Sequence, residues 1–390
     1  MRPVLVVVLV DALGWTLAGR DERFAPALVH RRPLATVLGF SSGALPTAFT
    51  GRATSEHGRW LMYRRAGADG GVFRGLEWLR WLPARLRRSW RLTRALSAWV
   101  ARRVRGYFDL YEIPREQLAA FDLPEREDIF RPGGLPCDSL WDSLERRGLA
   151  WRGWNWRTPE PQARGEALVA LEQGGLDLAF VYSARLDASL HHEGSRGAGV
   201  RRGLDDWSRW FDDAAAAARR GGREPWLYLC SDHGMVDVVA HADVAARLDA
   251  LPPRRGRDYL VFLDSTMARF WWRDAAVRDV VRAGLAAESR GRWLSAEDLA
   301  QAGAAFPDHR YGEDVFLLDP GVLLLPSFMG RAPLAAMHGY DPSHPDMAGV
   351  LASNRALPDD VTHLAHLRGF LERELDAAHG ARPAAGPEAA

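Results

Sequence analysis

The stretch "LYLCSDHGMVDV", residues 227–238, joins an apolar run to an adjacent acid and imidazole. Two other apolar runs, "PVLVVVLVD" (3–11) and "DLAFVYSARLD" (177–187), also end in an aspartate. Continuous runs of this length are typical of strands that are buried on both faces in parallel or mixed sheets. Because ligands bind beyond the carboxyl ends of such strands, we expect the three aspartates to share one site.

Helix-forming stretches alternate with these strands, over Cys137–Gly148, Pro161–Gly174 and Ala198–Arg220. This alternation predicts an α/β protein, built as a three-layer α/β/α sandwich with a central, mostly parallel sheet. We expect the sandwich to be the catalytic core and to comprise residues 1–64, 132–255 and 328–379.

Two stretches interrupt the alternation and are expected to cap the site edge of the sheet. Residues 65–131 are rich in arginine and tryptophan. Residues 256–327 hold two more strand-like runs with a helical stretch between them, which predicts a small α+β subdomain. The composition of residues 380–390, "GARPAAGPEAA", predicts a disordered tail.

The overall composition is that of a globular protein, with 47% hydrophobic and 26% charged residues. A formal net charge of +1 gives no protein-wide attraction to acidic partners. Cys137 and Cys230 are the two cysteines and form neither a disulfide framework nor a zinc-binding spacing, so a reducing compartment is expected. The apolar run near the N-terminus is too short to span a membrane and no cleavage pattern follows it, so we expect a cytoplasmic protein.

Two short motifs have the spacing of metal ligands. Asp187 and His191 are four residues apart, which places both on one face of a helical turn. Asp232 and His233 can reach one ion only from an irregular turn, and Gly234 permits such a turn. Each motif alone also fits a chance or capping role.

Taken together, the candidate ligands are three carboxylates and three imidazoles. This donor set suits Zn²⁺ or Mn²⁺ better than Ca²⁺. It is large enough for two ions about 4 Å apart. The six residues are Asp11, Asp187, His191, Asp232, His233 and His338.

The candidate nucleophile lies in "GFSSGALPTAFTGRATSEHG", residues 39–58. A helix is expected over Gly43–Thr50, so Ser41 and Ser42 stand at its N-terminus, where free N–H groups and the helix dipole favour phosphate. Contact with a metal would lower the pKa of a hydroxyl there and make it a nucleophile. The alternative is that either serine is only a helix cap.

The motifs, in their order along the chain, resemble those of the alkaline phosphatase superfamily, and most of all its type I phosphodiesterase/nucleotide pyrophosphatase branch. They are Asp11, "SSGALPTAFTGRATSEHG", "DASLHHEG", "SDHGM" and "HGYDPSHPDM". "YLVFLDSTMARFWW" is also similar to a bacterial subgroup of that branch. The resemblance covers residues 1–60, 177–240 and most of 256–354, and residues 65–130 least.

This resemblance implies an alkaline phosphatase-like fold and a phosphoric-ester hydrolase, either phosphodiesterase or phosphatase. It implies a covalent phosphoserine intermediate and two metal ions, Zn²⁺ or alternatively Mn²⁺. One ion would be held by Asp187, His191 and His338, and the other by Asp11, Asp232, His233 and the nucleophile oxygen. In this branch the nucleophile stands nine residues before a Thr-Gly pair, which gives Ser41, with Ser42 as the competing choice.

One departure from the family pattern concerns the phosphate contact. Nucleotide-cleaving relatives carry an asparagine after the His-Gly pair, where this chain has Met62. We therefore expect phosphate to contact the backbone N–H of Ser42 or Gly43, or Arg59. The departure weakens the case for nucleotide pyrophosphatase activity and leaves phosphoester hydrolysis in general less affected.

Several alternative functions share this fold. A phosphotransferase, a phosphonate or sulfate ester hydrolase and a phosphoglycerate-mutase-like isomerase are the alternatives within the superfamily. Ser41 is followed by "SGAL", which lacks the context that formylglycine sulfatases require. A non-catalytic binding protein is the alternative of another class, and the complete ligand set argues against it.

Residues 74–105 contain ten arginines, four tryptophans and a single acid, Glu77. One interpretation is an arginine-coated amphipathic helix over Ala84–Val104 that packs on the core. The other is a surface for an anionic substrate or for peripheral contact with an anionic membrane. Specific nucleic-acid binding is not expected, because the charge is one local stripe on a neutral protein. The expected substrate is a small-molecule, lipid-linked or sugar-linked phosphoester, and no pattern indicates an oligomeric state.

Overall fold

Strand β1 (Pro3–Val10) lies inside the central sheet, and its side chains alternate between two buried layers. The computed structural model describes residues 1–68, 70–87 and 89–380, so the tail expected to be disordered lies outside the described residues from 381 onward. Val6 and Val8 pack into one hydrophobic cluster, and Leu5 and Val7 pack into another on the opposite face. Both faces of the strand are therefore covered, as its continuous apolar run predicts.

The central sheet has six strands in the order β2-β16-β7-β1-β6-β5. Strands β5, β6, β1 and β7 are parallel, whereas β16 runs antiparallel to both β7 and β2. The prediction of a mostly parallel central sheet is confirmed. The other strands of this sheet are β2 (His30–Leu34), β5 (Trp151–Trp154), β6 (Leu178–Ser183), β7 (Glu224–Cys230) and β16 (Gly349–Ser353).

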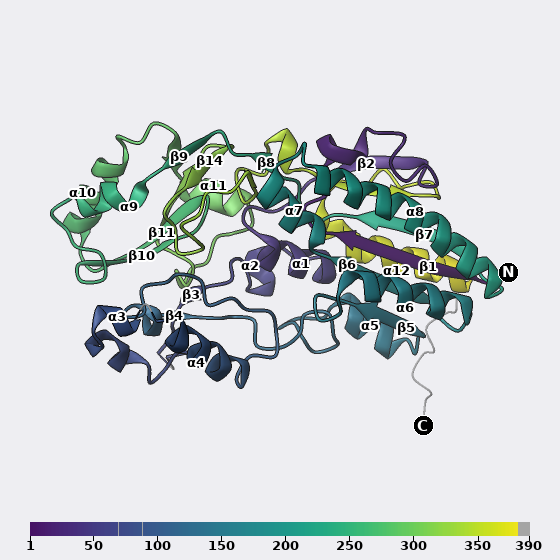
Figure 1. Ribbon diagram of the computed structural model, residues 1–390, viewed down its shortest axis with the longest axis horizontal. Coiled ribbons are helices and arrows are strands. Elements are labelled where there is room, and N and C mark those ends of the chain that lie inside the picture. Colours follow the sequence, from purple (N-terminus) through teal and green to yellow (C-terminus); the bar gives the residue numbers. More distant parts are fainter. Residues whose placement is uncertain (69, 88, 381–390) are drawn as a thin grey trace, which may run out of the picture.

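Helices cover both faces of the sheet, which confirms the three-layer sandwich. Helices α6 (Glu160–Glu172) and α8 (Ala198–Arg220) belong to the cluster on one face. Helices α1 (Ser41–Thr50), α5 (Leu140–Arg146) and α12 (Leu367–His379) belong to the cluster on the other. The parallel strands point their carboxyl ends away from the chain termini and toward the inserted segments (Figure 1).

The two inserted segments lie at the end of the molecule opposite the N-terminus (Figure 1). The second contains an antiparallel sheet in the order β10-β11-β13-β12. Side chains of both segments, among them Phe73 and Val100 from the first and Val261 and Phe270 from the second, share one hydrophobic core. The insertions therefore form a common cap.

The elements of the cap have the following bounds. The first segment holds β3 (Arg64–Arg65), η2 (Glu77–Trp81), α3 (Ala84–Arg87), α4 (Trp90–Ala101), η3 (Leu118–Ala120) and β4 (Phe121–Asp122). The second holds β10 (Tyr259–Leu263), β11 (Met267–Trp272), α10 (Ala275–Leu285), β12 (Gly291–Trp293), α11 (Ala296–Gln301) and β13 (Asp314–Leu318). The helix expected over Ala84–Val104 is thus divided into α3 and α4 and ends at Ala101.

The remaining elements of the chain are short. They are η1 (Trp15–Gly19), α2 (Thr54–His57), α7 (Arg185–Glu193), β8 (Val236–Asp237), β9 (Ala240–Ala242), α9 (Val244–Asp249), β14 (Val322–Leu324), β15 (Ala336–Met337), η4 (Pro345–Met347) and η5 (Leu364–His366). Within the described ranges, every helix is too short or too polar to cross a membrane.

Candidate metal and catalytic site

Three predicted ligands meet where β1 and β7 end. Asp11 directly follows β1, and Asp232 and His233 follow β7. His233 Nε2 lies 3.4 Å from Asp11 Oδ1 and 3.3 Å from Asp232 Oδ2. All three side chains are buried, and their ligand atoms lie within 4.8 Å of one another. Parallel neighbouring strands thus bring residues about 220 positions apart to one point.

The backbone around this triad fixes the imidazole of His233. Its Nδ1 lies 3.0 Å from the carbonyl oxygen of Gly234, so Nδ1 donates and Nε2 presents its lone pair to the triad. Asp232 and His233 lie on an irregular turn, and Gly234 in that turn is not in the left-handed region. A Cβ at this position would lie 2.0 Å from the carbonyl oxygen of Asp346, so the glycine serves a close backbone approach.

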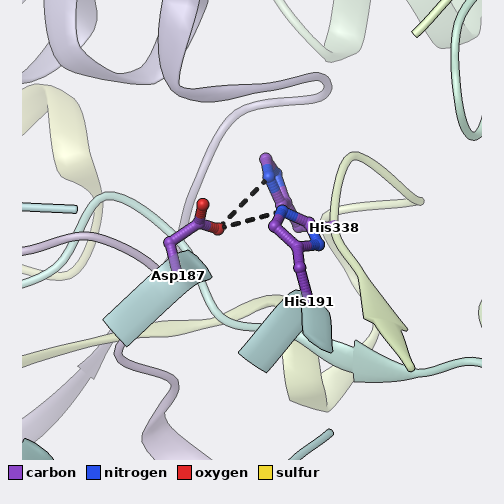
Figure 2. A group of neighbouring side chains, drawn as sticks. All are labelled: Asp187, His191 and His338. Atoms are coloured by element: carbon purple, nitrogen blue, oxygen red, sulfur yellow. Dashed lines mark ion pairs between the residues drawn. The ribbon is translucent and has the colours of Figure 1, made fainter. Parts of the chain in front are cut away.

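The other three predicted ligands form a second triad, drawn in Figure 2. Asp187 and His191 come from α7, and His338 follows β15. Asp187 Oδ1 lies 3.2 Å from His191 Nε2 and 3.7 Å from His338 Nε2. His191 Nδ1 lies 2.9 Å from the carbonyl oxygen of Ala336, which directs Nε2 toward the aspartate in the same way as in the first triad.

The buried carboxylates of the two triads lie close together, so a bound cation would stabilise their charged forms. Burial raises the pKa of Asp11 well above its ordinary value, and the neighbouring Asp232 and Asp187 raise it further. Burial also raises the pKa of Asp232. His338 has its pKa lowered well below the usual value by burial and by the neighbouring His233. In the described part of the chain, the only ion-pair partners of the three carboxylates are histidines.

Two buried carboxylate oxygens of the triads, Asp187 Oδ1 and Asp232 Oδ2, have no hydrogen-bond partner among the described residues. Orphaned atoms of this kind are rare in folded proteins, and a bound ion would account for them. With carboxylate and imidazole donors, the two triads fit divalent ions such as Zn²⁺ or Mn²⁺.

The two candidate nucleophiles have different surroundings. Ser41 Oγ lies 2.9 Å from His233 Nε2 and 3.4 Å from each carboxylate oxygen of Asp11. Ser42 Oγ donates instead to the carbonyl oxygen of Trp60 at 3.4 Å. The geometry therefore places the hydroxyl of Ser41, and not that of Ser42, against the first triad.

Helix α1 begins at Ser41, two residues earlier than expected. The N–H of Gly43 donates to the carbonyl oxygen of Phe40 at 2.8 Å, so it is already satisfied. The N–H of Ser42 has no acceptor among the described residues. Of the two backbone groups considered for phosphate, the structure leaves Ser42 N–H free at a helix N-terminus.

A cavity of about 250 Å³ opens onto both triads, and the cap closes its far side. Ser41, Ser42 and Arg59 line it, and so does Met62, where relatives carry asparagine. Arg59 is 6% exposed and donates from Nη2 to the carbonyl oxygen of Gly134 at 3.0 Å. Its Nε and Nη1 have no partner among the described residues, which leaves a buried cation with unused donors.

Several cavity residues were not anticipated from the sequence. The hydroxyl of Tyr182, near the end of β6, donates to Asp11 Oδ2 at 2.5 Å and orients that carboxylate. Trp156 lines the cavity together with Tyr107. Glu125 also lines it, and burial raises its pKa to about 7. The sequence offers one signal for Tyr182, because its hydroxyl stands in an otherwise apolar strand. It offers no comparable signal for the cavity residues that come from the cap.

Comparison with solved structures shows the same fold in nucleotide pyrophosphatase/phosphodiesterases. Human ectonucleotide pyrophosphatase/phosphodiesterase 5 has a TM-score of 0.65 at 14% identity, covering 96% of this chain and 95% of its own. The murine protein gives 0.63 at 14% identity, and its inactive variant in complex with AMP gives 0.63 at 16%, both with the same coverage. Neither a protein-family model nor a curated protein matches the chain. The chain therefore has the fold of the nucleotide pyrophosphatase/phosphodiesterases, as the resemblance of its motifs predicts.

Proposed function

We propose that this protein is a metal-dependent phosphoric-ester hydrolase of the phosphodiesterase type, with Ser41 as its nucleophile. The proposal rests on the position of Ser41 Oγ, which lies 2.9 Å from His233 Nε2 and 3.4 Å from the carboxylate of Asp11. Ser41 is also the first residue of helix α1. A hydroxyl in this position can attack phosphorus while helix N–H groups contact the phosphate.

Each triad would hold one divalent ion, with Asp187, His191 and His338 around one and Asp11, Asp232 and His233 around the other. When bound, such ions lower the pKa of a neighbouring hydroxyl and offset the negative charge of phosphate oxygens. Tyr182 and the carbonyl oxygens of Gly234 and Ala336 keep three of these ligands in place. Zn²⁺ suits the nitrogen and oxygen donors, and Mn²⁺ is the alternative.

The reaction has two steps at Ser41. In the first, Ser41 Oγ loses its proton and forms a bond to phosphorus while the bond to the leaving oxygen breaks, and the leaving oxygen takes up a proton. In the second, water cleaves the phosphoserine and returns the hydroxyl. The N–H of Ser42 and the free nitrogens of Arg59 are the groups of this chain that would contact the phosphate oxygens.

The cavity indicates what the substrate carries beside its phosphate. Its walls beyond the triads are mainly apolar and include Leu61, Met62, Phe130 and Trp156. An ester whose organic group is apolar next to the phosphate would fill this space. A lipid-linked or other small-molecule phosphoester with an apolar organic group fits this description better than a sugar-linked one, and the missing asparagine at Met62 argues against a dedicated nucleotide pyrophosphatase.

The test is hydrolysis of bis-p-nitrophenyl phosphate and p-nitrophenyl phosphate by the Zn²⁺-loaded and Mn²⁺-loaded protein. We expect release of nitrophenol, a loss of at least about 10³-fold in Ser41→Ala with its metal content retained, and a change under about tenfold in Ser42→Ala. If Ser42→Ala instead abolished turnover, the assignment of Ser41 as the nucleophile would be wrong. Two bound ions without turnover on either ester would indicate the binding protein.

A further inference from the structure

Four large apolar side chains project from a short part of the cap. Trp78, Trp81, Leu86 and Trp90 are 50%, 77%, 53% and 67% exposed. They belong to η2, α3 and the first turn of α4. We call the surface formed by residues 78–103 the Arg/Trp surface. Single exposed apolar residues are common, but three tryptophans and a leucine within this short segment mark an interaction site.

The same surface carries an excess of unpaired positive charge. Arg87 pairs with Glu116, and Arg105, just beyond the surface, pairs with Glu127. The other arginines in and beside this surface that the structure describes are exposed and have no ion pair with a described residue. They are Arg74, Arg80, Arg85, Arg91, Arg94, Arg102 and Arg103.

Folding does not explain these exposed groups. Helix α4 already buries Leu96 and Val100 in the core of the cap, and its partly buried Leu92 and Trp99 pack against the same core. Trp78, Trp81 and Trp90 leave half or more of their surface outside this core. A hydrophobic and cationic surface that folding does not need is available to a partner.

The chemistry of the surface favours a lipid interface over single-stranded nucleic acid. Guanidinium groups already lie over three of the indole rings: Arg80 lies 4.7 Å from the centroid of Trp81, Arg91 lies 5.7 Å from that of Trp90, and Arg103 lies 3.7 Å from that of Trp99. A covered face cannot stack on a base. Leu86 has no role in base recognition, whereas aliphatic and indole groups flanked by arginine are typical of the headgroup region of a membrane.

The surface adjoins the cavity over the two triads. A groove of about 950 Å³ is lined by Arg87, Trp90 and Arg94, and also by Tyr111 and Met329. Tyr111 and Met329 line the cavity over the two triads as well. A partner on the Arg/Trp surface would therefore lie beside the candidate site.

We propose that the Arg/Trp surface docks this protein on an anionic lipid surface. The indole rings and Leu86 enter the headgroup region, and the unpaired arginines contact the lipid phosphates. The proposal does not depend on catalysis, although docking would place the groove against the lipid. The chemical class of the partner is a membrane that contains anionic phospholipid.

The experiment is co-sedimentation of the full chain with vesicles of phosphatidylcholine, with or without about one-third phosphatidylglycerol, at about 50 mM and about 500 mM NaCl. We expect sedimentation with the anionic vesicles at low salt and its loss at high salt or without anionic lipid. The triple variant Arg80→Gln, Arg85→Gln, Arg91→Gln should bind about a hundredfold more weakly. The double variant Trp81→Ala, Leu86→Ala should bind about tenfold more weakly, because apolar area no longer enters the interface.

The matched control removes three exposed arginines elsewhere: Arg196→Gln, Arg202→Gln, Arg219→Gln. It changes the net charge equally and should bind vesicles within about threefold of the wild type if the Arg/Trp surface is responsible. Equal losses in both triple variants would overturn the proposal, as would absence of sedimentation at low salt. Binding to a single-stranded oligonucleotide without vesicle binding would also overturn it and assign the surface to nucleic acid. The surface variants should keep the melting temperature of the wild type, which excludes misfolding as the cause of weaker vesicle binding. They should also hydrolyse soluble nitrophenyl esters at the wild-type rate, which keeps this test independent of the catalytic proposal.

Discussion

The imidazole ring of His233 stacks on that of His338, with centroids 3.9 Å apart and planes 15° apart. The two rings belong to different triads and come from turns more than a hundred residues apart in the chain. The ring of His191, by contrast, has its centroid 5.4 Å from that of His338, and its ion pair is with Asp187 of its own triad. The stacked pair is therefore a direct side-chain contact between the two candidate metal positions.

This link predicts different metal losses in two histidine variants. His191→Ala should lower the metal content from two ions to one, because only the second triad loses a ligand. His338→Ala should also weaken the remaining ion by about tenfold, because the ring that supports His233 is gone. Metal analysis after dialysis against graded chelator measures both effects, and equal behaviour of the two variants would contradict the link.

The positions of the site aspartates could be predicted from the sequence because they depend on local patterns. An apolar run that ends in an aspartate identifies a strand end, and parallel strands bring their ends together, as Asp11 and Asp232 do. The i, i+4 spacing of Asp187 and His191 is equally local. The role of Gly234 could not be predicted, since it depends on the carbonyl oxygen of Asp346, which lies in η4, far along the chain.

The cap was the least predictable part of the fold. The sequence indicates two insertions, but their shared core arises from contacts such as Phe121 with Phe262, which no periodicity within either segment specifies. For the same reason Tyr107 and Glu125 could not be assigned to the cavity. Residues that reach a site from a cap depend on tertiary packing, whereas those at strand ends depend on topology.

Arg59 provides a test of phosphate recognition. Arg59→Met removes a buried cation whose Nε and Nη1 have no partner among the described residues, so kcat/KM for a nitrophenyl phosphoester should fall about 10–100-fold. Arg59→Lys should recover part of this loss, since it restores charge without the planar donor set. Steady-state kinetics beside thermal melts separates the effect from the lost bond to Gly134. Full activity in a stably folded Arg59→Met variant would exclude a phosphate contact.

Glu125 predicts a pH dependence of stability. Burial raises its pKa in the folded protein from 4.5 to about 7, so the folded state binds the proton more tightly than the unfolded state does. Its contribution to the free energy of unfolding is therefore fully present below about pH 4.5 and is lost as the pH rises to about 7, by roughly 3 kcal/mol at most. Glu125→Gln should keep the neutral form at every pH and flatten this decline.

Urea unfolding between about pH 5 and about pH 8, in the same buffer and metal, compares this variant with the wild type. Glu127→Gln is the control, because Glu127 is exposed and only two residues away. It should leave the wild-type pH profile unchanged. A profile that is equally steep in Glu125→Gln and wild type would show that another group causes the decline.

The close contacts of Gly234 predict that the turn after β7 tolerates no side chain at this position. In Gly234→Ala the new Cβ would lie 2.0 Å from the carbonyl oxygen of Asp346 and 2.9 Å from that of Ala348, so the turn carrying Asp232 and His233 must shift. We expect a loss of about 1–3 kcal/mol in stability. The ion of the first triad should also be lost, while the second triad keeps its own.

Gly165→Ala is the matched control for this change. Gly165 lies exposed in the middle of α6, and a Cβ there meets nothing within 4 Å. The substitution should therefore leave metal content unchanged and raise stability by up to about 1 kcal/mol, because alanine favours the helix. Chemical unfolding and metal analysis on both variants decide the matter. Two bound ions and wild-type stability in Gly234→Ala would mean that η4, which carries Asp346, shifts instead, and that the close approach does not hold the ligands in place.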